Sequence, residues 1–225
     1  GCGDRLEPSR SINREYTVGW APLGSGDAGS ATRARLTFYE IDTRRLIGSV
    51  YLAALDGTII QPYSERRRGI EFEVVHETPR WFGHFNFSRI LARRTNTLTG
   101  QGFDFTAGIP GTTSGLSLGY RVIPEKLEVG YRVRHIHDQL VLPGSTSLTA
   151  STQYCGKVTP AGVAQAAVTL QDLFATWRIH KNVNLSLAIN NLTNQRWCNN
   201  GDELGNVIGL QGPGRSIRLS LTAQY

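Results

Sequence analysis

Residues 217–225 read Ile-Arg-Leu-Ser-Leu-Thr-Ala-Gln-Tyr, and every second residue of this stretch is apolar or aromatic. Such strict alternation is typical of a β-strand with one apolar face, because successive side chains of a strand point to opposite sides. A helix would place its apolar residues three or four positions apart. The stretch is therefore predicted to be a strand, and its apolar face consists of Ile217, Leu219, Leu221, Ala223 and Tyr225.

The same alternation recurs upstream, and helical spacing is weak throughout the chain. We predict nine strands in all, at residues 15–20, 33–38, 70–74, 83–87, 116–122, 127–134, 173–177, 183–189 and 217–225. The fold class predicted from this pattern is all-β and antiparallel.

The connections between these strands fall into two classes. Short turns are predicted near residues 22–27, 77–80, 123–125 and 180–182, and long polar connections at residues 43–66, 95–112, 138–162 and 196–215. Short and long connections alternate strictly along the chain. A soluble sandwich has no reason to place every long loop at one end, whereas outer-membrane barrels combine short periplasmic turns with long extracellular loops. The pattern indicates a transmembrane β-barrel.

Composition agrees with this interpretation. Hydrophobic residues make up 40% of the 225 residues, the mean hydropathy is -0.25, and no run of about 18 apolar residues could form a membrane helix. A barrel needs only every second residue to be apolar. The sequence contains no methionine, and an odd number of strands cannot close a barrel with both ends in the periplasm. We therefore expect earlier strands upstream of residue 1.

The net charge of +6 is carried almost wholly by arginines that are spread over the alternating segments. A solvated rim or barrel interior explains this distribution better than nucleic-acid binding, so no nucleic-acid partner is expected. The main cluster is the run Arg66, Arg67 and Arg68.

Four aromatic residues lie next to a predicted short turn or at the chain end, in the phase of the apolar face: Trp20, Trp81, Trp177 and Tyr225. Amphipathic rings favour the membrane interface, so these residues are predicted to form an aromatic girdle on the periplasmic side. The alternative is that each is an ordinary core aromatic.

Several segments, taken in order, resemble TonB-dependent receptors. The closing pattern of that family resembles Asp172–Arg178, Val183–Asn194 and Gly212–Ser216, where an Asn-Leu-Thr-Asn turn precedes a last strand opened by Gly-Arg. The segment Leu6–Gly19 resembles the Leu-Lys-Pro-Glu segment of the family, with Glu7 in place of the usual Lys. The final strand resembles the C-terminal signal that the barrel-assembly machinery recognises in outer-membrane barrels.

This resemblance implies that residues 1–225 are the C-terminal portion of a 22-stranded barrel in the bacterial outer membrane. The N-terminal plug domain and the segment that binds TonB are not present in the sequence. The implied function is TonB-dependent uptake of an iron carrier. Haem or a haem carrier protein is placed slightly ahead of a ferric siderophore, and the carrier is a transported ligand rather than a cofactor. The competing hypothesis is a secreted β protein without transport activity, such as an adhesin or a sandwich-type binding module.

No catalytic constellation or metal-ligand spacing is found, so an enzyme is not expected. For ligand binding, Arg66, Arg67 and Arg68 could attract an anionic siderophore or haem propionates, or instead contact lipopolysaccharide phosphates or solvent. His135 and His137 are candidate haem ligands. Their phase matches that of Tyr131 and Val133, which directs them towards lipid headgroups unless a bulge intervenes.

Three cysteines are present, and Cys155 and Cys198 both fall in long connections predicted to be extracellular. A disulfide that ties these two connections together is the predicted use of the pair. Besides TonB, the expected partners are the lipid and lipopolysaccharide of the outer membrane and the barrel-assembly machinery.

Overall fold

The computed structural model describes residues 8–22, 30–52, 57–100, 102–104, 111–143, 156–198 and 211–224. No helix within these ranges is long and apolar enough to span a membrane. The strands are β1 (Arg10–Trp20), β2 (Ala31–Leu52), β3 (Gly57–Glu77), β4 (Trp81–Asn96), β5 (Gly102–Asp104), β6 (Thr112–Ile123), β7 (Leu127–Ile136), β8 (Gln139–Pro143), β9 (Gly156–Thr159), β10 (Gly162–Gln165), β11 (Val168–His180), β12 (Val183–Asn190) and β13 (Ser216–Ala223).

The main sheet has the strand order β1-β2-β3-β4-β6-β7-β11-β12-β13, and β5 pairs with β4 beside this path. Each of the nine alternating segments in the sequence overlaps one of these nine strands, and the pairs from β4 to β13 are antiparallel. The prediction of an all-β antiparallel sheet is thus confirmed. A smaller sheet has the order β8-β10-β9.

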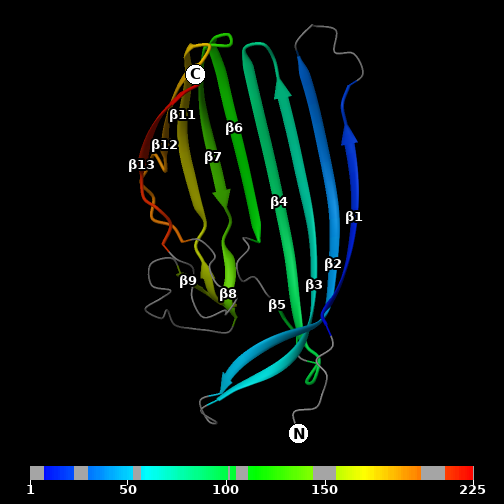
Figure 1. The fold of residues 1–225 in the computed structure, drawn as a ribbon. Helices are drawn as coiled ribbons and strands as arrows, with labels where there is room; N and C mark the ends of the chain where they lie inside the picture. Colours follow the sequence, from blue (N-terminus) through cyan, green and yellow to red (C-terminus); the bar gives the residue numbers. More distant parts are fainter. Residues whose placement is uncertain are drawn as a thin grey trace. The chain divides into compact units, whose positions relative to one another are not determined.

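The chain divides into two compact units. The first unit comprises Gly1–Thr17, Thr37–Ile70 and Ile90–Phe105, and the second comprises Val18–Leu36, Glu71–Arg89 and Thr106–Tyr225. In the second unit, the turns that follow β3, β6 and β11 lie together at the upper end of Figure 1.

The register of the second unit separates two faces of the sheet. Leu118 pairs with Tyr131, Tyr131 with Leu173, Leu173 with Ile189, and Ile189 with Ile217, so one apolar row crosses five strands. The next row contains Ser117, Arg132 and Asp172 on the opposite side. We call these sides the apolar face and the polar face, and use the same names for the matching alternation phases of β1 to β4.

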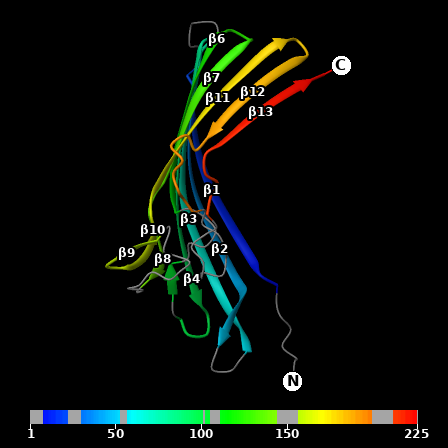
Figure 2. The same ribbon diagram turned by 90° about the vertical axis from the view of Figure 1, so that its left-hand side faces the viewer.

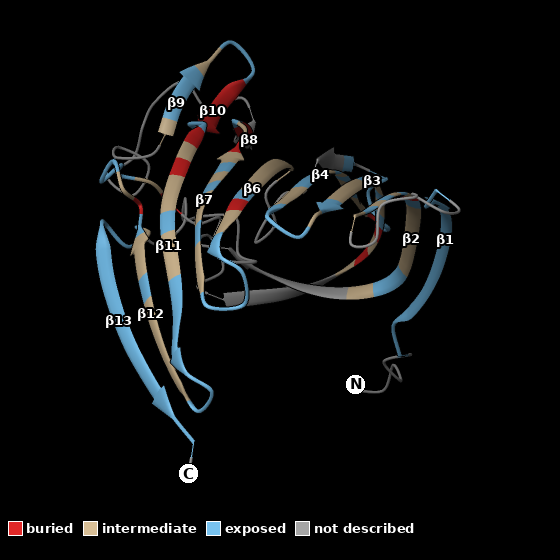
Figure 3. Ribbon diagram, turned by 90° about the horizontal axis from the view of Figure 1, so that it is seen from above, coloured by how far each residue is buried: buried red, intermediate tan, exposed pale blue. Residues whose placement is uncertain are grey.

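The apolar face is exposed rather than packed in a core. Leu219 and Leu221 of β13 are 68% and 66% exposed, and Figure 3 shows β13 exposed along its length. Soluble monomers rarely expose apolar surface on this scale, whereas a transmembrane barrel directs such a surface towards lipid.

The connection at residues 43–66 was predicted to be a long loop, and this prediction is wrong. Strand β2 continues to Leu52, β3 begins at Gly57, and the two strands are hydrogen-bonded neighbours. Beyond the alternating apolar run of these strands, apolar residues such as Leu46 and Ile47 stand next to each other, so no strict alternation marks the strands in the sequence. Two other predicted long connections also contain short strands, namely β5 and the set β8 to β10.

Buried apolar residues lie on the polar face near the ends of β7 and β11. Ile136, Val168 and Leu170 form a small cluster against which Trp197 packs. The sheet β8-β10-β9 lies beyond these strand ends (Figure 2), and Val163 of β10 is fully buried.

Candidate functional site

A row of aromatic rings and glycines crosses the polar face of the second unit. The register aligns Phe82 with Gly119, Gly119 with Gly130, and Gly130 with Phe174. A Cβ atom built on Gly119 would lie 1.9 Å from Cζ of Phe82, and one on Gly130 would lie 2.1 Å from Cζ of Phe174. The two rings therefore occupy the space that side chains at the two glycines would fill, and their centroids are 6.5 Å apart.

Arginines lie over these rings and over Trp197. The guanidinium carbon of Arg132 is 6.0 Å from the centroid of the Phe174 ring, and that of Arg134 is 5.5 Å from the Trp197 ring. Such positions allow cation–π attraction. Arg132 Nε also donates a hydrogen bond to Ser117 Oγ at 3.3 Å.

Arg132 and Arg134 differ from Arg121 on the same face. Arg121 pairs with Glu77 and lies 3.8 Å from Glu128 Oε2, whereas neither Arg132 nor Arg134 forms an ion pair with a described residue. Their side chains are exposed, so they leave two positive charges on the polar face. The sequence analysis did not single out these two residues, although their position in the polar phase of a predicted strand was a usable signal.

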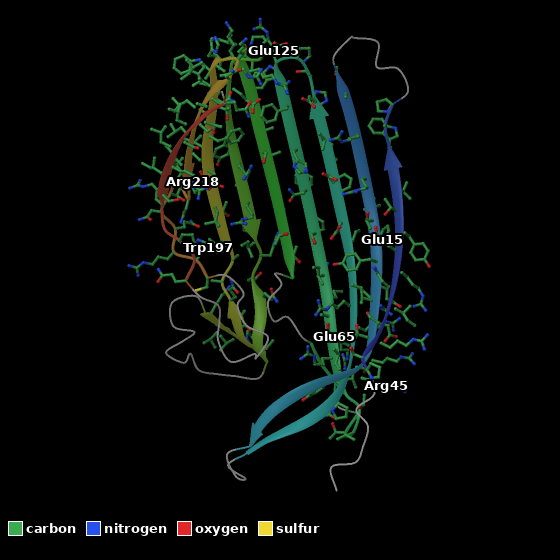
Figure 4. The ribbon with its side chains drawn as sticks, in the orientation of Figure 1. Glu15, Arg45, Glu65, Glu125, Trp197 and Arg218 are labelled. Atoms are coloured by element: carbon green, nitrogen blue, oxygen red, sulfur yellow. The ribbon has the colours of Figure 1, made fainter. Side chains whose placement is uncertain are left out.

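The predicted run Arg66 to Arg68 does not act as one group. Arg66 Nη2 and Arg68 Nε donate to Glu40 Oε2 at 2.8 and 2.9 Å. Arg67 instead pairs with Glu65, because consecutive side chains of a strand point to opposite faces. In Figure 4, Glu65 is labelled where the neighbouring strands β3 and β4 lie side by side.

The two carboxylates at these arginines have different surroundings. Glu65 is 4% exposed and also accepts hydrogen bonds from Arg94 Nε and Nη2 at 3.2 and 2.8 Å. Glu40 lies beyond Phe38, the last residue of the alternating apolar run in β2, and the hydrogen bond from Arg66 lowers the pKa of its carboxyl group. Glu40 is therefore a carboxylate at neutral pH.

The structure brings His135 and His137 together, with ring centroids 4.5 Å apart. No register shift occurs between β7 and β11, so His135 remains in the phase of Tyr131 and Val133, on the side of the apolar face. Its Nδ1 lies 2.8 Å from Thr169 Oγ1. Within the described ranges no group of three His, Cys, Asp or Glu side chains could hold a metal ion. Haem ligation by this pair stays a prediction.

The side chains of Trp20, Trp81 and Trp177 are exposed, in the apolar phase of strand ends next to connections predicted to be short. The rings of Trp81 and Tyr120 have centroids 4.4 Å apart. Tyr225 lies outside the described residues. Ile217, Leu219, Leu221 and Ala223 share the apolar phase of β13, as the sequence predicts. Their roles in a girdle and in barrel assembly stay predictions.

Cys198 is disulfide-bonded. Cys155 lies outside the described residues, so the pairing of Cys155 with Cys198 stays a prediction.

The motif residues 191–194 and 212–215 form one interlocked turn. Asn191 Oδ1 accepts a hydrogen bond from Gln195 N at 2.9 Å, and Asn191 Nδ2 donates to the carbonyl oxygens of Gln195 and Pro213 at 2.8 and 3.2 Å. Asn194 Oδ1 accepts from Arg215 N at 2.9 Å. These bonds attach the turn after β12 to the segment that leads into β13.

Comparison with known proteins agrees with this architecture. Residues 3–192 match the family described as TonB dependent receptor-like, beta-barrel. A search of curated proteins finds no match.

Solved structures share the fold at low sequence identity. The FrpB iron transporter from Neisseria meningitidis superposes with a TM-score of 0.69 at 19% identity, over 98% of this chain and 32% of that one. The pyoverdine receptor FpvA from Pseudomonas aeruginosa gives 0.66 at 16% identity, over 98% and 30% of the two chains. The copper transporter OprC gives 0.67 at 15% identity, over 99% and 32%. The chain thus spans less than a third of each.

The family match covers most of the chain, and the alternating faces and strand order are those of its barrels. The chain therefore belongs to the TonB-dependent receptor β-barrel family of the bacterial outer membrane.

Proposed function

We propose that the protein takes up an iron carrier across the outer membrane in a TonB-dependent manner. Family membership supports the class of transporter, and the names of the FrpB and FpvA structures support iron or a siderophore as cargo. Catalysis is not part of this proposal. The secreted adhesin or sandwich-type module is disfavoured by the family match and by the exposed apolar face.

The observation that carries the proposal is the pair of arginines on the polar face of β7. The polar faces of transmembrane barrel strands line the interior. Arg132 and Arg134 lie in the half of β7 away from the short turn that follows β6, the half expected to open to the outside. The guanidinium carbons lie 6.0 and 5.5 Å from the ring centroids of Phe174 and Trp197, and a cation–π contact of this kind leaves the positive charge in place.

Iron carriers suit such a site because ferric siderophores and haem commonly present carboxylate or catecholate oxygens. A guanidinium group binds such oxygens through charge-assisted and often bidentate hydrogen bonds. Haem would additionally need an axial His or Tyr. His135 is in the phase of the apolar face, so the arginine pair supports an anionic carrier more directly than it supports haem.

Uptake assays on a strain lacking the chromosomal gene test the proposal. Cells that carry the wild-type gene are expected to accumulate radioactive iron from a ferric siderophore panel or from haem, and to lose this accumulation when TonB is deleted. The double variant Arg132→Gln/Arg134→Gln should raise the half-saturating concentration at least about tenfold, because a hydrogen bond to a charged group contributes roughly 1.5 kcal/mol.

The matched control is Arg80→Gln, since Arg80 lies in the turn at the other end of the sheet and donates to Tyr120 Oη at 3.3 Å. This control should leave uptake unchanged. Accumulation that persists without TonB, or that requires neither siderophore nor haem, would refute the proposed transport. Separate siderophore and haem arms decide which carrier is used.

A further inference from the structure

In the first unit, the apolar phase of the strands ends in a charged cluster. Tyr16 of β1 and Phe38 of β2 are 68% and 48% exposed in this phase. Two residues further along each strand, in the same phase, stand Arg14 and Glu40. On β3, Arg68 likewise lies two residues from Ile70. The surface thus changes from apolar to charged over about 7 Å of strand.

Three arginines meet one carboxylate in this cluster. Glu40 Oε2 accepts hydrogen bonds from Arg66 and Arg68 at 2.8 and 2.9 Å, and Glu40 Oε1 lies 3.4 Å from Arg14 Nη1. One carboxylate cannot neutralise three guanidinium groups, so the cluster keeps a positive excess. The side chains of Arg14, Arg66 and Arg68 are 52%, 51% and 56% exposed, whereas that of Glu40 is 24% exposed.

Two arginines on the polar face of β3 and β4 are arranged differently. Arg67 and Arg94 both bind Glu65, and their side chains are 32% and 21% exposed. Both side chains are thus partly buried and form ion pairs with a buried carboxylate. In the apolar phase of β1 to β3, by contrast, three exposed guanidinium groups share one carboxylate. We name Arg14, Glu40, Arg66 and Arg68 the arginine cluster.

We propose that the arginine cluster binds the phosphate groups of lipopolysaccharide in the outer leaflet of the outer membrane. The change from the exposed residues Tyr16 and Phe38 to charged residues is the change expected at the boundary between hydrocarbon and headgroups, so the proposal places the cluster at headgroup level. Along β3, Arg66 and Arg68 also precede the apolar run, whereas the predicted short turn at residues 77–80 follows it, and the strand ends away from the short turns are the extracellular ends in an outer-membrane barrel. Arginine matches the geometry of phosphate, and clustered arginines are attracted to anionic headgroups.

Glu40 holds Arg66 and Arg68 side by side and competes with phosphate for the same donors. The proposal therefore predicts opposite changes in lipid binding when the positive charges and when the negative charge of the cluster are removed. Removal of the arginines weakens lipid binding, whereas Glu40→Gln preserves or strengthens it. A cluster that served only to stabilise the strands would lose stability in both cases, with no gain in lipid binding for Glu40→Gln.

The test uses the full gene product, purified from outer membranes and depleted of bound lipid in detergent. The probes are bisphosphorylated lipid A, the same lipid after enzymatic removal of its phosphates, and inorganic pyrophosphate as a free-phosphate competitor. The wild-type protein should bind bisphosphorylated lipid A at least tenfold more tightly than the dephosphorylated lipid. Millimolar pyrophosphate should displace it only weakly, since the apolar contacts belong to the lipid.

Arg66→Gln/Arg68→Gln should lower the affinity for bisphosphorylated lipid A at least tenfold and reduce its dependence on salt. The matched control is Arg33→Gln/Arg218→Gln, which removes the same charge from exposed positions in the polar phase and should change the affinity less than twofold. Resistance of the folded protein to unfolding by detergent is measured for each variant, and affinities are compared per folded molecule.

Equal affinity of the wild-type protein for the two lipids would overturn the proposal, and this comparison requires no variant. So would an unchanged affinity in Arg66→Gln/Arg68→Gln, or an equal loss in the control. Full competition by pyrophosphate would assign the cluster to free phosphate instead of lipid. Uptake of iron is measured separately, so failure of this proposal and failure of the transport proposal are distinguishable.

Discussion

Asn191 concentrates the interactions that close the turn between β12 and β13. It is 5% exposed, its backbone N donates to Asp172 Oδ1 at 2.8 Å, and its φ of 51° lies in the left-handed region. Asparagine tolerates that region better than most residues and can bond neighbouring backbone groups through its side chain. The physical requirement for the Asn-Leu-Thr-Asn motif is thus a left-handed residue whose amide group binds two chain segments.

Replacing Asn191 by alanine should destabilise the folded protein by about 3 kcal/mol. The loss combines three side-chain hydrogen bonds at roughly 1 kcal/mol each with the cost of a left-handed alanine, less partial rescue by water. Asn191→Gly should lose less, since glycine adopts the same φ freely. Denaturant titration in detergent measures both, with Asn184→Ala on β12 as control. Equal losses for Ala and Gly would show that the backbone conformation contributes nothing.

The sequence predicts the face on which a single residue lies better than it predicts the partner of that residue. The face of His135 follows from simple alternation, because no bulge interrupts β7. Alternation also predicts that Arg66 and Arg68 lie on the opposite face from Arg67. It does not predict that Arg66 and Arg68 pair with Glu40. Which residues meet across β2 and β3 depends on the register of the two strands, and beyond the alternating apolar run the sequence pattern specifies that register only weakly.

Among the strands, close packing of rings on glycines couples β4, β6, β7 and β11. Phe82 and Phe174 cover Gly119 and Gly130 in a single register row, so each ring replaces the side chain that the facing strand lacks. Strand glycines are otherwise weak points of a sheet, and aromatic rings that cover them restore buried surface.

Gly130→Ala is expected to displace the Phe174 ring and to destabilise the protein by about 1–3 kcal/mol, the usual range for overpacking. In Phe174→Leu the ring is absent, so the same alanine substitution should cost much less. A double-mutant cycle in denaturant titrations measures this coupling. Additive effects of the two substitutions would mean that the ring and the glycine do not interact in the folded protein.

Alternation along β13 predicts how neighbouring residues meet lipid and water. A cysteine at Leu219 should react with a lipid-soluble maleimide and be protected from a membrane-impermeant one, because it lies on the apolar face. A cysteine at Arg218 should show the reverse preference. The full gene product in its native membrane is used, and mass spectrometry quantifies labelling. Equal labelling at the two positions would contradict the orientation of the faces.

Strands can be predicted from the sequence where contact with lipid requires alternating apolar residues. Strand segments outside the lipid-covered region cannot be predicted in this way. The nine strands from β1 to β13 along the main path of the sheet were located by their apolar phase, whereas β5 was not, and the outer parts of β2 and β3 were predicted to be a loop. Where lipid does not cover one face of a strand, strict alternation is not required, and backbone hydrogen bonds to neighbouring strands can maintain the strand without it. Short strands such as β5 and β9 leave too few residues for a pattern.

At the scale of the molecule, the strand order begins with β1 and ends with β13. The apolar side chains of these strands, such as Val18 at 70% exposure and Ile217 at 70%, face away from the protein. Strands of this kind are stable only when lipid or detergent covers their apolar face.

Residues 1–225 produced alone are therefore expected to require detergent. In buffer the polypeptide should sediment as large aggregates, because exposed apolar strands associate through their faces and edges. The same preparation folded into micelles should show the β-sheet signal in circular dichroism and a much smaller sedimentation coefficient. A monodisperse monomer in detergent-free buffer would contradict the assignment of the apolar face to lipid.

The continuation of β2 and β3 past the apolar run also affects how this surface can evolve. Its shape is set by backbone hydrogen bonds between two neighbouring strands, which every residue except proline can supply. In an outer-membrane barrel with these strand ends outside the cell, residues at such positions can change under selection by antibodies or bacteriophages while the backbone pairing persists. Backbone groups that pair between neighbouring strands are also less accessible to a protease than those of an extended loop. A cell surface protein thereby combines a variable exterior with a constant framework.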